Sequence, residues 1–190
     1  MQERCKMVTY EEDLEKAAAY HGHLCSGQIL GVRMARLGLE VMGLADRDPK
    51  KMRDLLVFVE SDRCATDAAY VVTGATMGRR RMKYKDYGKM AMSFYYIPTK
   101  KAVRIKPINE DRPPEGADLK EFWAKYTDEE LFKWENVEII VDENDLPGKP
   151  RDHAVCSKCG ERILDGRQVE VNGQVKCRAC ANGAYYKVID

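Results

Sequence analysis

The spacing of apolar residues in the first part of the chain predicts helices on either side of a buried strand. Apolar positions recur every three or four residues in 11–22 and in 27–43, and both stretches end at glycine, a common helix terminator. Ser26 directly precedes the second stretch and is its expected N-cap. The short apolar run at 55–60 predicts a buried strand, and 61–74 predicts a turn that enters a third helix.

Alternating apolar residues predict strands further along the chain. The segments KMAMSFYYI (89–97) and KAVRIK (101–106) are strand-like, and residues 98–100 between them suit the turn of a hairpin. The segment VEIIV (137–141) predicts a last strand.

A short helix is expected between the hairpin and that last strand, in TDEELFKW (127–134). Its Thr127 and Glu130 have the spacing of a capping box. Helices and strands mixed in this way predict the α+β class, with a mixed β-sheet flanked by helices.

The composition of residues 142–153, DENDLPGKPRDH, is that of a linker. Two prolines, a glycine and charges of both signs end the apolar pattern there. The sequence therefore predicts a larger domain of residues 1–147 and a small domain of residues 148–190.

Charge and cysteine content narrow the setting. The 190 residues include 32 basic and 31 acidic side chains, a net charge of +1 that gives no overall attraction for nucleic acid or membrane. The N-terminal stretch is charged, without the apolar core of an export signal, and no apolar run is long enough to span a bilayer. We expect a cytoplasmic protein, whose seven cysteines are better explained as metal ligands or reactive thiols than as disulfides.

The clearest chemical signal is a set of four cysteines near the C-terminus. They form two C-x2-C pairs, Cys156 with Cys159 and Cys177 with Cys180. Four thiolates can bind zinc tetrahedrally, and the Asp165-Gly166 and Asn172-Gly173 turns between the pairs predict a β-hairpin, as in a zinc ribbon. Iron, alone or in an iron-sulfur cluster, also suits four thiolates.

The role of this zinc-binding tail is left open by its sequence. Such modules bind nucleic acid, bind protein or brace a domain. The charge available for nucleic acid is limited to a few residues of the tail: Lys158, Arg162, Arg167, Lys176 and Arg178.

A second candidate site is the stretch HGHLC. If the chain is extended there, His21, His23 and Cys25 project to one side and can reach the same ion. Cys25 precedes a helix, and Cys64 follows a strand and begins another helix, positions that favour thiolate. Alternatively, the histidines pack against a helix end and both cysteines are inert.

Four motifs together resemble the N-terminal domain of the E-subunit family of formylmethanofuran dehydrogenase. They are HGHLCSGQILGVRMA, VESDRCATDAA, TGATMGRR and DYGKMAMSF, and the tail resembles the zinc-finger domain of some members. The resemblance implies a mixed-sheet α+β domain, a zinc-finger tail and an association with anaerobic one-carbon metabolism. It confers no activity, because the formate and formyl chemistry belongs to other subunits, for whose cofactors this chain has no motif.

The resemblance also implies metal ligands. The family's histidine-rich motif falls on His21, His23 and Cys25, and its second cysteine motif on Cys64 with Asp67. Zinc, nickel or iron suits this set, and a catalytic centre, for which Cys25 and Cys64 are the candidates, needs an open position. Asp67 orients an imidazole or, as is more common for such a residue, starts a helix.

Three functions are consistent with these features. The first is a metal-binding accessory, redox or metal-delivery protein of anaerobic metabolism. The second is a regulatory or adaptor protein whose zinc finger binds a protein or nucleic-acid partner, and the third is a hydrolase with zinc-activated water.

Partners are expected on similar grounds. The alternation MAMSFYYI (90–97) favours a homodimer, and the family favours the other chains of formylmethanofuran dehydrogenase or of further anaerobic enzymes. The basic run 78–85 suits a solvated loop better than a nucleic-acid contact, and no membrane partner is expected.

Overall fold

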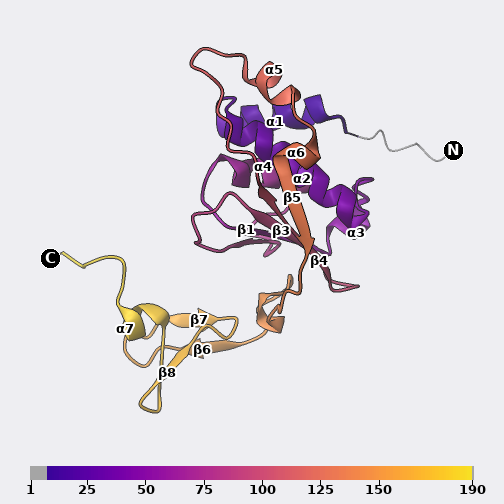
Figure 1. The fold of residues 1–190 in the computed structure, drawn as a ribbon. Coiled ribbons are helices and arrows are strands. Elements are labelled where there is room, and N and C mark those ends of the chain that lie inside the picture. Colours follow the sequence, from indigo (N-terminus) through magenta and orange to yellow (C-terminus); the bar gives the residue numbers. More distant parts are fainter. Residues whose placement is uncertain (1–7, 190) are drawn as a thin grey trace. The chain divides into compact units, whose positions relative to one another are not determined.

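The computed structural model describes residues 8–189, which fall into two compact units (Figure 1). The division lies between residues 140 and 141, so the linker segment that begins at residue 142 belongs with the smaller unit. The division expected from the sequence lies slightly further along, between residues 147 and 148. Within residues 8–189, no helix combines the length and apolar character needed to cross a membrane.

The first two helices begin and end as their sequences direct, with one correction. Helix α1 (Tyr10–His21) starts at a capping box and ends at Gly22, whose φ of 94° is left-handed. Helix α2 (Ser26–Met42) is N-capped by Cys25, so the expected cap at Ser26 is wrong. The Ser26 hydroxyl instead accepts a hydrogen bond from Trp123 Nε1 at 2.9 Å, a tertiary contact that local sequence does not reveal.

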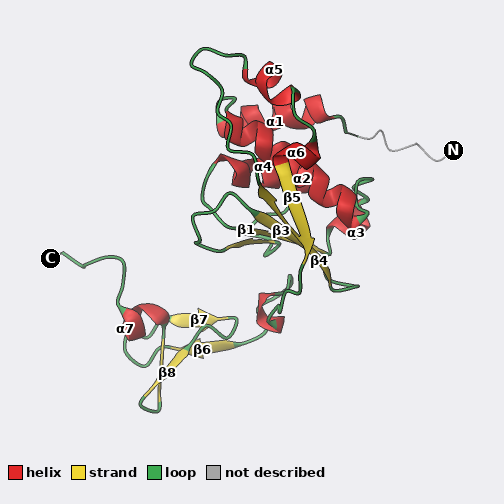
Figure 2. Ribbon diagram, in the orientation of Figure 1, coloured by secondary structure: helices red, strands yellow, loops and turns green. Residues whose placement is uncertain are grey.

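Five strands form a mixed sheet in the order β2-β1-β3-β4-β5 (Figure 2). Strands β1 and β2 are parallel, and the other neighbours are antiparallel, including the predicted β3-β4 hairpin. The strands are β1 (Leu55–Val59), β2 (Met82–Tyr84), β3 (Met92–Tyr96), β4 (Lys101–Pro107) and β5 (Phe132–Asn136). Helix α4 (Cys64–Thr73) connects the parallel pair, as a crossover must. The predicted α+β class is confirmed.

Helices α1, α2 and α4 pack on one another and against the sheet (Figure 1). Phe94 of β3 is fully buried against Gly38 of α2, where even a single added Cβ atom would overlap the ring. Most of the segment 90–97 is therefore buried inside this unit, and it does not form the exposed surface that the dimer argument assumed.

The last strand of the sheet is not the one expected. Residues 137–141 form no strand, and Ile140 is 94% exposed. Strand β5 follows directly after the short helix α6 (Asp128–Leu131), pairs with β4 up to Asn136 opposite Val103, and leads to one more bond from the Val137 amide. The free edge of β4 is thus occupied before the apolar residues of 137–141 are reached.

Three short elements were not predicted: α3 (Pro49–Met52), β2, and α5 (Leu119–Ala124). Strand β2 lies inside the basic run 78–85, whose Arg81 is buried and donates to the carbonyls of Met52 and Gly74. This run is therefore only partly a solvated loop.

The smaller unit consists of short strands around the tail cysteines. Its elements are η1 (Glu143–Asp145), β6 (His153–Val155), β7 (Arg162–Leu164), β8 (Val169–Val171), β9 (Gln174–Lys176) and α7 (Arg178–Asn182). Strand β6 pairs with β7 and β8 with β9, so Asn172-Gly173 closes a hairpin as predicted. The left-handed Asp165-Gly166 turn leads from one hairpin to the next and closes neither.

Candidate metal centres

The four tail cysteines converge. One sulfur from each of Cys156, Cys159, Cys177 and Cys180 lies within 4.8 Å of every other. Hydrogen bonds from backbone amides, above all that of Cys159, lower the pKa of Cys156 to about 6, while the neighbouring thiols, first Cys177, raise that of Cys180 to about 12. Four thiols that cannot all ionise together are a site in which a divalent cation is strongly favoured.

A second group of donors lies where three helix ends meet. His21 is the last residue of α1, Cys25 is the N-cap of α2, and Cys64 is the first residue of α4. One donor atom from each lies within 4.8 Å of the other two. Two sequence-distant cysteine motifs therefore supply a common site, as the resemblance implies.

Asp67 holds the imidazole of this group. Its Oδ2 lies 2.8 Å from His21 Nδ1, while the N-cap of α4 is Arg63. The more common role considered for Asp67, starting the helix, is thus not the one observed. A hydrogen bond at Nδ1 leaves Nε2 as the nitrogen available to a metal, the usual arrangement of a carboxylate behind a metal-binding histidine.

His23 lies beside this group and not within it. Its ring centroid is 4.8 Å from that of His21, with the rings tilted by 40°. Because α1 continues through His21 and Gly22 is left-handed, the chain is not extended here, and the alternating projection expected from spacing does not apply. The turn between α1 and α2 brings His21 to Cys25 instead.

The surroundings of the N-terminal group fit a transition metal. An imidazole and two thiols are ligands for zinc, nickel or iron, and both cysteines lie at helix N-termini, where thiolate is favoured. Gly27 provides room for them, since a Cβ there would lie 2.8 Å from Cys64 Cβ and 3.6 Å from Cys25 Sγ. Burial, together with the Cys25 thiol, raises the pKa of Cys64, a cost that a bound cation offsets.

This group is open on one side. A cavity of about 450 Å³ is lined by residues from α1 and from the start of α4: His21, Asp62, Arg63, Cys64, Thr66 and Asp67. Three protein donors next to an open cavity match the arrangement of a metal that keeps one position for water or another ligand.

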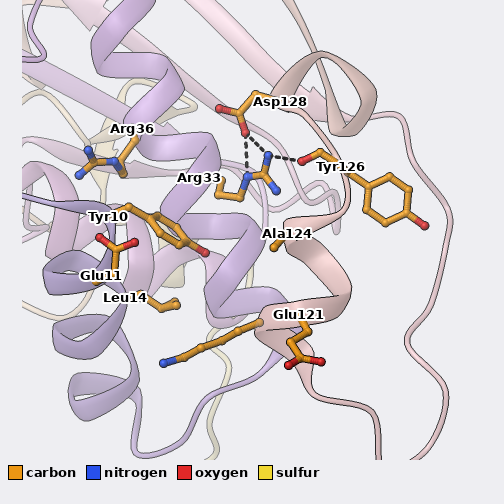
Figure 3. Close-up of a pocket in the computed structure, with 10 residues that line it drawn as sticks. Tyr10, Glu11, Leu14, Arg33, Arg36, Glu121, Ala124, Tyr126 and Asp128 are labelled. Carbon is orange, nitrogen blue, oxygen red and sulfur yellow. Dashed lines mark hydrogen bonds and ion pairs between the residues drawn. The ribbon is translucent and has the colours of Figure 1, made fainter.

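A second cavity, of about 570 Å³, lies between α1, α2 and the α5-α6 segment (Figure 3). Arg33 forms one wall, donating to Asp128 and to the carbonyls of Trp123 and Tyr126. Tyr10 points into this space from α1, and its pKa is raised by burial. The sequence signal for this cavity was Arg33 itself, a cation within the apolar stripe of α2.

The charges around this second cavity are of both signs. Arg36 shares the buried carboxylate of Asp13 with Arg47, which leaves one positive charge in excess. Within residues 8–189, Glu11, Lys120 and Glu121 have no ion-pair partner. The cavity thus combines an apolar floor at Leu14 and Ala124 with cations and carboxylates at its rim.

Fold and donors together define a class: an α+β domain with a His-Cys-Cys centre, followed by a four-cysteine zinc finger. The family model described as FmdE, molybdenum formylmethanofuran dehydrogenase operon, matches residues 20–145, and the chain belongs to this family. The prokaryotic dksA/traR C4-type zinc finger matches residues 150–186.

Two similar proteins are informative. A protein of Archaeoglobus fulgidus named "Probable S-adenosyl-L-methionine-binding protein" is 30% identical over 210 aligned positions, which cover 93% of this chain and 54% of that protein. The chain thus spans about half the length of this curated relative. The crystal structure of an FmdE-like protein of the tungsten formylmethanofuran dehydrogenase type, from Syntrophus aciditrophicus, is 22% identical with a TM-score of 0.60. The match covers 98% of this chain and all of that one, and it supports the fold.

Proposed function

We propose that the chain binds a transition metal through His21, Cys25 and Cys64 and serves as an accessory, redox or metal-handling protein of anaerobic one-carbon metabolism. One observation carries the proposal: three soft or borderline donors from three helices lie within 4.8 Å of one another. The family supplies the metabolic setting, since its model is named for the formylmethanofuran dehydrogenase operon.

The open side of the centre determines which chemistry is available. A metal held here would supply a Lewis-acidic or ligand-exchanging position facing the cavity. Asp67 keeps the His21 ring oriented, and the Arg63 guanidinium lines the same cavity, where it favours a ligand with negative charge. Metal transfer and small-ligand binding both need such access, whereas a purely structural centre does not.

Metal content tests this proposal. We expect about two metal ions per chain in the wild type and about one in His21→Ala, because removing a directional ligand opens the N-terminal centre while the four thiolates of the tail are unaffected. His23→Ala is the matched comparison, since His23 lies next to His21 but outside the group of donors. Equal metal content in the wild type and His21→Ala contradicts the proposal.

A second candidate function is binding of S-adenosyl-L-methionine in the cavity between α1, α2 and α5. This ligand carries a carboxylate, an ammonium, a sulfonium and an apolar heterocycle, and the cavity offers charges of both signs around an apolar floor. Its volume lies in the range of small-molecule sites. The name of the Archaeoglobus relative adds support, although only about half of that protein is matched.

Calorimetric titration with S-adenosyl-L-methionine tests this second function. Ala124→Trp, which fills the cavity, should weaken binding by at least about tenfold, because the ligand must lose its apolar contacts. Lys125→Ala is the control on the same segment, since Lys125 lies over the Phe122 ring and does not line the cavity. Absent binding, or equal binding by wild type and Ala124→Trp, excludes this site.

A further inference from the structure

Helix α2 approaches α4 closely next to the N-terminal metal centre. The two helices meet through small residues: a Cβ on Gly31 would lie 2.7 Å from Ala65 Cα, and one on Gly27 would lie 2.8 Å from Cys64 Cβ. These distances are shorter than real Cβ atoms allow. The two glycines differ in what they face, because Gly31 faces the helix backbone and Gly27 faces a metal donor.

The Cys64 side chain has no slack to accommodate a methyl group at Gly27. Its Cβ is fixed to the backbone of α4, and its Sγ would be only 3.3 Å from the new atom, tighter than nearly all real contacts. The same methyl group would also lie 3.6 Å from Cys25 Sγ. Any substitution at Gly27 therefore displaces Cys64, in the space between the two sulfur donors.

Gln28 is a buried amide next to the same cysteine. Its side chain is fully buried, and Nε2 donates a 2.7 Å hydrogen bond to the Cys64 carbonyl. Among residues 8–189, its Oε1 has no hydrogen-bond partner. A buried acceptor without a partner is destabilising, so the position of Gln28 is not explained by stability of the fold.

We propose that Gly27 and Gln28 are positioning residues of the N-terminal metal centre, although neither is a ligand. Gly27 leaves the space that Cys64 Sγ needs, and the Gln28 amide holds the Cys64 carbonyl at the first turn of α4, so that the sulfur faces His21 and Cys25. This inference rests on the proposed metal binding at these residues and identifies what sets its affinity.

Gln28→Leu separates this role from a structural one. The Cys64 carbonyl keeps its acceptor role within α4, and the unpartnered oxygen is removed, so the unfolding temperature should be unchanged or higher. Metal affinity at the N-terminal centre should nevertheless fall by about 10–100-fold, the usual effect of losing a residue that supports a ligand. A residue with only a packing role would not change these two quantities in opposite directions.

Gly27→Ala tests the space beside Cys64, with two matched controls. Gly31→Ala introduces a comparable overlap in the same helix interface but away from the donors, and Gly78→Ala introduces a methyl group with nothing within 4 Å. We expect Gly27→Ala to weaken metal binding by at least about tenfold and more than Gly31→Ala does, with Gly78→Ala unchanged.

The measurement is a cobalt(II) titration of the metal-free full-length chain, followed by thiolate-to-cobalt absorption, with thermal unfolding of each variant. His21→Ala gives the signal of the tail centre alone, and the difference from wild type is the N-terminal centre. If that difference is absent, the proposed function itself fails. If it is present but Gln28→Leu and Gly27→Ala bind cobalt as the wild type does, or Gly31→Ala weakens binding as much as Gly27→Ala, the positioning role is overturned.

Discussion

Replacing Asp67 by Asn tests how the N-terminal centre is organised. The change keeps the shape of the side chain and one acceptor for His21 Nδ1, but it removes the carboxylate that lies 2.8 Å from the ring. Loss of such a partner lowers metal affinity by about 10–100-fold, which corresponds to about 1.4–2.8 kcal/mol.

The fold should respond far less than the metal. The His21 and Asp67 side chains are 18% and 39% exposed, so their contact is screened by solvent and contributes less than about 1 kcal/mol to the free energy of unfolding. We therefore expect a clear loss of metal affinity with little change in the unfolding temperature of the metal-free protein.

The assay is competition for the metal against a chromogenic chelator, with Asp62→Asn as control. Asp62 lines the same cavity and carries the same charge, but it makes no hydrogen bond to His21. Asp67→Asn should weaken binding by at least about ten times more than Asp62→Asn does. Equal losses in the two variants would mean that charge near the site matters and orientation of the imidazole does not, which refutes the reasoning.

Three further predictions follow from the fold. Cys159→Ser should release the tail metal and unfold residues 151–190 while the larger unit stays folded by circular dichroism, and loss of both units would refute it. Gly38→Ala should destabilise the larger unit by about 1–3 kcal/mol in denaturant titrations, because Phe94 fills the space; an unchanged midpoint contradicts this. We expect a homodimer by light scattering, formed at the outer edge of β5, with Trp134→Lys shifting it to monomer; a concentration-independent monomer mass excludes it.

The sequence predicted the elements whose signals are local. Helices α1, α2 and α4 end at left-handed glycines, which follow directly from an apolar period that stops at Gly22, Gly43 and Gly74. The capping box at Thr127 was found for the same reason. The final strand was misplaced because which apolar segment pairs with β4 depends on register, and register depends on residues far away in the sequence.

The candidate site was predicted in part. Spacing indicated Cys25 and Cys64 at helix starts, and both lie there. Their convergence with His21 depends on how α1, α2 and α4 pack, and the supporting roles of Asp67 and Gln28 are contacts across the sequence between helix ends. No local pattern encodes such contacts, so these residues could be suspected at most from family motifs.

Thiol labelling of Cys25 and Cys64 tests the central claim most directly. In the purified full-length chain, treated with an alkylating reagent and mapped by peptide mass, both cysteines should be protected until a chelator is added and should then react, because a metal-bound thiolate is not available as a nucleophile. Protection that the chelator removes from both residues, and that is already absent in His21→Ala, is the predicted result. Labelling at the same rate with and without chelator would show that no metal is bound there and would contradict the account.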